Sequence, residues 1–267
     1  MAGASDLMGD VTLGEVVDYL DGLLRIREVP DEAGAVNGLQ VENRGAVGGF
    51  IAAVDASQAT IDGVVVAAAR FRKPPLLLVH HGLFWDGNLP LTGRRYHRIG
   101  ALLAHDLALY SAHIPLDVHP GLGNNAVLAG ELGLVEQAPF DTYKGIPMGV
   151  QGRVPHGEGR DSLVSRINGL LGTDAKLIPG GPERVSRVGI ITGGAGSRIG
   201  SARAAGLDTY ITGEGAHYTY FDAMELGVNV IFAGHYATEQ VGVKALAAHL
   251  SGRYGLPWEF HHHPTGL

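Results

Sequence analysis

Short apolar blocks alternate along the chain with longer stretches in which apolar residues recur at helical spacing. The longer stretches predict amphipathic helices, of which residues 13–26 form the first, and a short block such as 76–79 predicts a strand buried in a parallel sheet. Further strands are predicted at 49–54, 108–111, 185–192, 208–212 and 229–233. This regular order of strand, helix and strand is typical of an α/β fold with mostly parallel, mixed sheets.

The domain organisation follows from the length and from a change in this pattern. A chain of 267 residues is long enough for two compact lobes. From about residue 135 an antiparallel strand is predicted at 147–154, and a capped helix follows at 161–171. We therefore expect one α/β lobe made of residues 1–130 and 237–267, a second made of 131–236, and the functional site in the cleft between them.

The composition is that of a folded protein, with 45% hydrophobic and 18% charged residues. A net charge of −7 gives no overall positive field, which argues against a nucleic-acid partner. No apolar run is long enough to span a membrane, and residues 1–10 lack the basic start and apolar centre of a signal peptide. We expect a cytoplasmic protein without membrane contact.

The chain has no cysteine, which excludes disulfides and every metal site built on thiolates. Any metal must be held by imidazole and carboxylate groups, which suit divalent Zn, Fe or Mn. The 13 histidines supply candidates.

The first candidates are His80 and His81, at the end of the strand predicted at 76–79. Open α/β sheets place their ligands beyond the carboxyl ends of their strands, so both imidazoles are candidate metal ligands. Taken alone, the pair is more typical of a polar loop in which the histidines cap backbone groups by hydrogen bonds. The pair by itself therefore does not establish a metal site.

The second candidates lie in Ser-Ala-His-Ile-Pro-Leu-Asp at 111–117, just past another predicted strand. Pro115 fixes the local backbone, so the carboxylate of Asp117 is a rigidly directed, hard ligand. His113 is a candidate acid/base group, a further ligand or a hydrogen-bond partner of a ligand. The alternative is that Asp117 only caps the loop before the helix predicted at 124–132.

The third candidates are His235, at the end of a predicted strand, and Glu239, in the first turn of the next helix. Their i,i+4 spacing puts both side chains on one helical face. A carboxylate is also well suited to bridge two cations. Alternatively, Glu239 only stabilises the helix N-terminus through the helix dipole.

Considered jointly, the three segments favour a metal site over loop capping. Each segment follows a strand, and in a parallel sheet those strand ends lie at one edge. One ion needs three or four protein ligands, whereas five candidates favour two ions about 3.5–4 Å apart.

Several motifs then resemble one family in order and spacing, the NGG-one-interacting-factor-three-like family, often labelled GTP cyclohydrolase 1 type 2 homologues. They are HHGLFW at 80–85, SAHIPLD at 111–117, GLGNN at 121–125, GGAG at 193–196 and GHYATE at 234–239, with NGLQV at 37–41 and PTGL at 264–267. The chain departs from the family at Gly82, where many members have proline, and at 32–36, which lack a common Trp-Asp pair. Both departures concern loop geometry and not the ligands.

The resemblance implies a two-lobe α/β fold with a dinuclear metal centre between the lobes and a toroidal homohexamer. The ligands it implies are His80, His81, Asp117, His235 and Glu239, with Glu239 bridging the two ions.

Two functions are compatible with this site. The first is a hydrolase that depends on two divalent ions (Zn, Fe or Mn) and acts on a small molecule, such as a purine nucleotide whose ring it opens as a GTP cyclohydrolase would. In that case His113 is the candidate for proton transfer. The alternative is a non-catalytic metal-binding or regulatory scaffold protein, because a ligand set does not by itself reveal turnover.

Three further polar features have no assigned role. The turn at 193–197 either cradles a phosphate or is a simple tight turn, and Glu214 and His217 either face the cleft or are a capping acid and a surface histidine. The histidines at 261–263 are not interpreted as a metal site.

Overall fold

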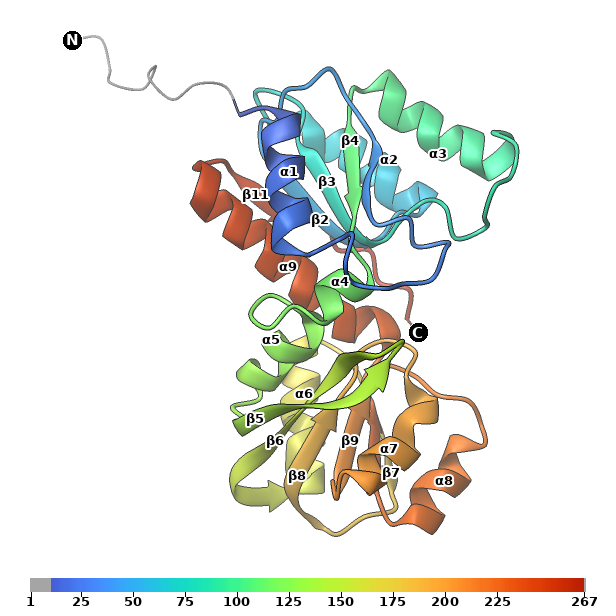
Figure 1. The fold of residues 1–267 in the computed structure, drawn as a ribbon, viewed down its shortest axis with the longest axis vertical. Coiled ribbons are helices and arrows are strands. Elements are labelled where there is room, and N and C mark those ends of the chain that lie inside the picture. Colours follow the sequence, from blue (N-terminus) through green and yellow to red (C-terminus); the bar gives the residue numbers. More distant parts are fainter. Residues whose placement is uncertain (1–10, 267) are drawn as a thin grey trace, which may run out of the picture. The chain divides into compact units, whose positions relative to one another are not determined.

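The computed structural model describes residues 11–266. Residues 1–10, for which the sequence predicts no signal peptide, and residue 267, the last of the PTGL ending, lie outside the described residues. The chain forms two compact units: unit 1 runs to Pro115 and includes Leu246–His263, and unit 2 comprises Leu116–Ala245 and the last residues from Pro264. The sequence places these boundaries near 130 and 236. Each unit has its own sheet with helices packed on it, which confirms the α/β class (Figure 1).

The sheet of unit 1 has the strand order β1-β4-β3-β2-β11. Its strands are β1 (Gly38–Val41), β2 (Phe50–Asp55), β3 (Leu76–His81), β4 (Ala108–Ser111) and β11 (Trp258–Phe260). The strand β1 pairs antiparallel with β4, whereas the pairs β4/β3, β3/β2 and β2/β11 are parallel. The apolar blocks predicted as buried parallel strands are therefore confirmed as β2, β3 and β4.

Helices cover both faces of this sheet (Figure 1). They are α1 (Leu13–Leu23), α2 (Gln58–Ala68), α3 (Gly93–Ala104) and the last turns of α9 (His235–Tyr254). Buried residues of α2 and α3, such as Ile61 and Leu102, share one apolar cluster with the sheet. The first helix begins at the capping box of Thr12 and ends at Leu23, earlier than predicted, because Arg25 takes a left-handed conformation with φ +54°.

The sheet of unit 2 has the order β5-β6-β8-β9-β10-β7. Its strands are β5 (Val135–Tyr143), β6 (Ile146–Gly159), β7 (Lys176–Pro179), β8 (Arg184–Ile190), β9 (Thr209–Thr212) and β10 (Asn229–Phe232). The central strands β8, β9 and β10 are parallel, and β5, β6 and β7 join them by antiparallel pairing. This sheet is more mixed than that of unit 1.

Two separate cores lie on the two faces of this sheet. One contains residues of α5 (Asn124–Glu131), α6 (Arg160–Leu171) and the first turns of α9, and the other contains residues of α7 (Ile199–Ala204) and α8 (Thr219–Leu226). Two short helical segments complete the described chain, α4 (Ile114–Asp117) and the 3-10 turn η1 (Gly196–Arg198). No helix in residues 11–266 is long and apolar enough to cross a membrane.

The sequence predicts that the candidate residues share one edge of a single parallel sheet, and this is wrong, because β3 and β4 belong to the sheet of unit 1 whereas β10 belongs to the sheet of unit 2. In unit 1 the parallel strands β2, β3 and β4 end at Asp55, His81 and Ser111. In unit 2 the parallel strands β8, β9 and β10 are followed by the loops that contain Thr192, Glu214 and His235. Each unit thus gathers its polar side chains at the carboxyl ends of its strands.

Candidate metal centre

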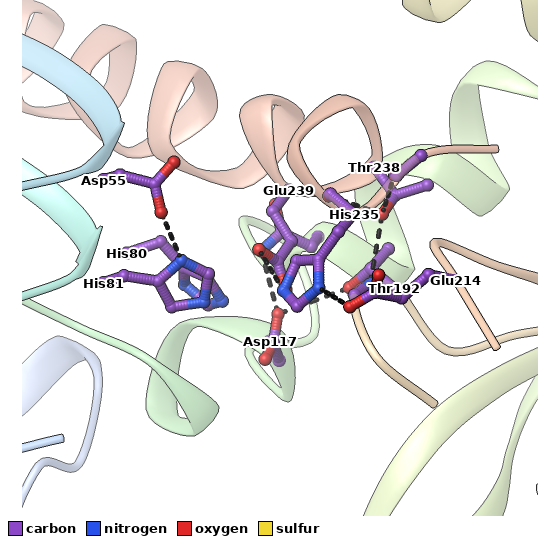
Figure 2. Close-up of polar contacts among 12 residues, drawn as sticks. Asp55, His80, His81, Asp117, Thr192, Glu214, His235, Thr238 and Glu239 are labelled. Atoms are coloured by element: carbon purple, nitrogen blue, oxygen red, sulfur yellow. Dashed lines mark hydrogen bonds and ion pairs between the residues drawn. The ribbon is translucent and has the colours of Figure 1, made fainter. Parts of the chain in front are cut away.

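His80 and His81 are the last two residues of β3 in unit 1. The Nδ1 of His80 lies 2.9 Å from the carbonyl oxygen of Ala112. The Nδ1 of His81 lies 2.8 Å from Oδ1 of Asp55 (Figure 2). Both oxygens only accept hydrogen bonds, so each Nδ1 carries the proton of its contact. Histidines that bind metals are commonly oriented in this way, through an acceptor on the other ring nitrogen.

The strand register explains why Asp55 reaches His81. The two residues are direct partners in the parallel pairing of β2 with β3, so their side chains lie side by side at the end of the sheet. The sequence indicates a helix N-cap at 55–57, and Ser57 is indeed the N-cap of α2. The role of Asp55 as a partner of His81 depends on the strand pairing and is not visible in the sequence.

His113 follows β4 and joins the two histidines in unit 1. Its ring centroid lies 5.0 Å from that of His80 and 5.5 Å from that of His81. One ring nitrogen of each of the three residues lies within 4.8 Å of those of the other two. Three imidazoles with their nitrogens so close together form a group that could bind a divalent ion.

In unit 2, His235 is the first residue of α9 and Glu239 lies one turn further on. His235 Nε2 is 3.2 Å from Glu239 Oε2, and His235 Nδ1 is 2.7 Å from Glu214 Oε1, so the imidazole is held between two carboxylates (Figure 2). The shared helical face expected from the i,i+4 spacing is thus observed. Burial disfavours the imidazolium, but the hydrogen bonds and negative charges of Glu239 and Glu214 outweigh it and raise the pKa of His235 to about 9.

A turn after β8 packs directly against this pair. Gly193 has φ +69°, and a side chain there would run into the carboxylate of Glu239. Its N–H donates to Thr238 Oγ1 at 3.1 Å, and its carbonyl oxygen accepts the N–H of Gly213 at 2.9 Å. At Gly193 the turn therefore fits close to α9, and this N–H is bound within the protein.

Asp117, the last residue of α4, is 4% exposed. Its Oδ1 accepts a hydrogen bond of 2.8 Å from Asn124 Nδ2. It also accepts one of 3.4 Å from Thr192 Oγ1 (Figure 2). Asn124 in turn accepts the N–H of Gly242 in α9 at 2.7 Å. The N-cap of α5 is Gly123, and Asp117 contacts this helix through the side chain of Asn124, the first residue of α5.

A cavity of about 220 Å³ opens beside Asp117 within unit 2. Its walls come from the loop after α4, the start of α5 and the hairpin of β5 and β6, and they include Pro139, Pro147 and Met148. Most of this lining is apolar, with Asp117 and Gln137 among its polar residues. A buried carboxylate at the wall of a mostly apolar cavity is a common feature of small-molecule sites.

The residues that the sequence did not assign are the partners that orient the candidates. Asp31, Asp55 and Asn124 each hold one candidate by a hydrogen bond between residues that are distant in the chain. Glu214, left open by the sequence, is a partner of His235, whereas His217 makes a ring contact with Phe221. Of these partners, Asn124 could have been found from the sequence, because it lies in the GLGNN motif at 121–125.

Comparisons with known proteins give one consistent result. A model of the Duf34/NIF3 family (NGG1p interacting factor 3) matches residues 11–265. A Deinococcus radiodurans protein described as a GTP cyclohydrolase 1 type 2 homolog is 42% identical over 259 residues, which cover 97% of this chain and 96% of that protein. The solved structure of the protein ybgI, described as of unknown function, has a TM-score of 0.86 and 36% identity, covering 96% of this chain and all of that one. A crystal structure of a Thermus thermophilus protein has a TM-score of 0.85 and 40% identity over the same shares.

Proposed function

The chain belongs to the Duf34/NIF3 family, and from this membership and its candidate ligands we propose that it is a hydrolase that depends on two divalent metal ions. The observation that carries the proposal is the outer hydrogen bonding of the histidines. His80, His81 and His235 each have Nδ1 bound to a carboxylate or carbonyl oxygen. In each ring Nε2 would then be the nitrogen that binds a metal, and at His235 this nitrogen lies 3.2 Å from Oε2 of Glu239, which we also assign as a ligand.

We assign five side chains as ligands of the two ions, as the family resemblance implies: His80, His81, Asp117, His235 and Glu239. The donor set fits divalent Zn, Fe or Mn, since it combines imidazole nitrogens with carboxylate oxygens and contains no thiolate. The side chain of Glu239 is 3% exposed and lies against His235, which supports the assignment of Glu239 as the bridge.

The chemistry of such a site is hydrolysis. A bound pair of divalent ions lowers the pKa of a water molecule and polarises the bond that is cleaved. We assign proton transfer to His113, whose ring lies beside those of His80 and His81. Its Nε2 would accept the proton of the attacking water and return it to the leaving nitrogen as the scissile carbon–nitrogen bond breaks.

The substrate class is a small molecule with a hydrolysable ring, and we propose a purine nucleotide. The name GTP cyclohydrolase 1 type 2 homolog, which several relatives carry, supports this choice. The mostly apolar cavity beside Asp117 offers a place for the base. We also propose that the protein acts in the cytoplasm as a toroidal homohexamer, as the family resemblance implies.

The test is metal-dependent hydrolysis with a matched pair of variants. Protein loaded with Zn²⁺, Fe²⁺ or Mn²⁺ is incubated with GTP and other purine nucleotides, and ring opening is followed by the change in ultraviolet absorption. Glu239→Gln should abolish turnover, whereas Glu225→Gln on the exposed side of α8 should leave it unchanged. Full activity of Glu239→Gln, or of protein stripped of metal, would contradict the proposal. Metal binding without any turnover would instead favour the scaffold function.

A further inference from the structure

His113 is held by a carboxylate that the sequence did not single out. Its Nδ1 lies 2.8 Å from Oδ1 and 3.1 Å from Oδ2 of Asp31, although 82 residues separate the two in the chain. The side chain of Asp31 is only 6% exposed, and that of His113 is 18% exposed. A buried carboxylate accepts hydrogen bonds and donates none, so Nδ1 of His113 must carry the proton.

Asp31 cannot easily turn away from His113, because the rest of the carboxylate is also bound. Oδ2 accepts the N–H of Ile114 at 3.0 Å and Nδ2 of Asn37 at 2.8 Å, and Oδ1 accepts the N–H of Glu32 at 2.6 Å. Asn37 Oδ1 accepts the backbone N–H of His113 itself at 2.8 Å. The backbone and the ring of His113 are therefore fixed by the same small network.

The electrostatic balance keeps Asp31 charged. Burial disfavours the carboxylate, but the hydrogen bond and charge of His113, with the donors from Asn37 and Glu32, outweigh it and hold the pKa of Asp31 below its usual value. A negative charge beside Nδ1 favours a proton on Nδ1, and therefore the Nδ1–H tautomer over the Nε2–H tautomer. The indole of Trp85 packs edge-on to the imidazole, with 4.9 Å between ring centroids, and limits rotation of the ring.

Anchoring the backbone does not explain the whole arrangement. The donors from Ile114, Asn37 and Glu32 would hold the segment without any contribution from an imidazole. The contact with the ring has a separate chemical consequence, because it decides which ring nitrogen has the lone pair.

We propose that Asp31 is a positioning residue that fixes His113 as the Nδ1–H tautomer. Nε2 of His113 is then the basic nitrogen, and it would accept the proton of the attacking water beside His80 and His81. This inference rests on the proposed function, since a base is needed there only if water is activated. The arrangement parallels that of Asp55 with His81, but the outcome differs. Asp55 orients a ligand, whereas Asp31 orients a group that moves a proton.

The contrast between these two carboxylates provides the test. In Asp31→Asn the side-chain amide offers one acceptor oxygen in place of two, so it cannot accept hydrogen bonds from all the partners of Asp31. Of these partners only the imidazole of His113 can adapt, because its proton can move from Nδ1 to Nε2. In protein labelled with ¹⁵N-histidine and loaded with Zn²⁺, the imidazole ¹⁵N shifts should show His113 as Nδ1–H in the parent chain. A substantial Nε2–H fraction should appear in Asp31→Asn, and none in Asp18→Asn on the exposed side of α1. The signal is assigned with His113→Gln.

Two further readouts separate positioning from metal binding. Asp31→Asn should retain its Zn²⁺ and lose roughly 10²–10⁴-fold in kcat on the nucleotide that the parent chain hydrolyses, which is the usual contribution of acid/base catalysis. Asp55→Asn should lose metal affinity by about 10–100-fold instead. Asp31→Glu keeps a carboxylate and should therefore show the Nδ1–H tautomer of the parent chain. This variant also replaces Asp31→Asn in the test if Asp31→Asn folds poorly.

An unchanged tautomer in Asp31→Asn would overturn the inference. A loss of Zn²⁺ from Asp31→Asn equal to that from Asp55→Asn would overturn it too, because His113 would then be a ligand. The NMR result does not depend on turnover. If the parent chain hydrolyses none of the nucleotides, the proposed function fails, while the tautomer shift still decides whether Asp31 fixes His113.

Discussion

Replacing Gly193 with alanine should destabilise unit 2 more than replacing Gly172 with alanine, and the difference measures how tightly the turn fits against Glu239. Both glycines have positive φ, +69° and +65°, a backbone conformation that strains an alanine at either position. A methyl group at Gly172 meets nothing within 4 Å, whereas one at Gly193 runs into the Glu239 carboxylate and approaches His235.

The magnitudes follow from these two terms. A non-glycine residue in the left-handed region costs about 1–2 kcal/mol, of which about 0.4–1 kcal/mol is offset because alanine restricts the unfolded chain. Gly172→Ala should therefore lower the free energy of unfolding by ~1 kcal/mol. Overpacking adds roughly 1–3 kcal/mol at Gly193. Gly193→Ala should thus lower the free energy of unfolding by this amount more than Gly172→Ala does.

The assay is urea denaturation of the metal-free proteins, compared at equal m-values. The double variant Gly193→Ala with Glu239→Ala provides the control, because removing the carboxylate removes the collision and should recover most of the added loss. Equal destabilisation by Gly193→Ala and Gly172→Ala would refute the close packing of the turn on Glu239. So would a double variant that shows no recovery.

Three further predictions follow from the site. Asn124→Ala should lower the free energy of unfolding, measured by urea denaturation, by about 1–3 kcal/mol, because the carboxylate of Asp117 loses a buried donor and the N–H of Gly242 loses its acceptor. An unchanged free energy of unfolding would show that neither hydrogen bond stabilises the fold. In metal-free protein, the ion pairs of His235 should contribute their full stabilisation below pH 6.5, the approximate pKa of this histidine in the unfolded chain. The stabilisation should disappear as the pH rises through about 9, the pKa of His235 in the folded protein. If a His235→Gln variant lost the same stability over this pH range, the assignment would be contradicted. Light scattering should give about 168 kDa for six chains of 28.0 kDa, and a monomer mass would exclude the proposed hexamer.

The strands that carry the candidates could be predicted from the sequence because their signal is local. The apolar block before His80 marks a buried strand by itself, and the spacing of His235 and Glu239 places them on one helical face. Pro115 predicts a rigid backbone before Asp117, and this segment forms the short helix α4 with Pro115 in its first turn, where proline is tolerated.

What the sequence could not predict depends on contacts between distant segments. The first five residues of β5 are all exposed, so this part of the strand lacks the alternation that marks a half-buried strand. The partners of the candidates present the same difficulty, since Asp31 and His113 meet only after β1, β3 and β4 have paired. A carboxylate with four polar partners looks, in the sequence, like any loop aspartate.

The central claim is that this chain binds two divalent ions through imidazole and carboxylate ligands, and its most direct test is metal stoichiometry. The protein is stripped with a chelator, titrated with Zn²⁺ in a calorimeter, and analysed for bound metal after desalting. Two equivalents per chain are predicted for the parent protein and for Glu225→Gln, and fewer than one for Glu239→Gln. No bound metal in the parent protein, or two equivalents retained by Glu239→Gln, would contradict the account.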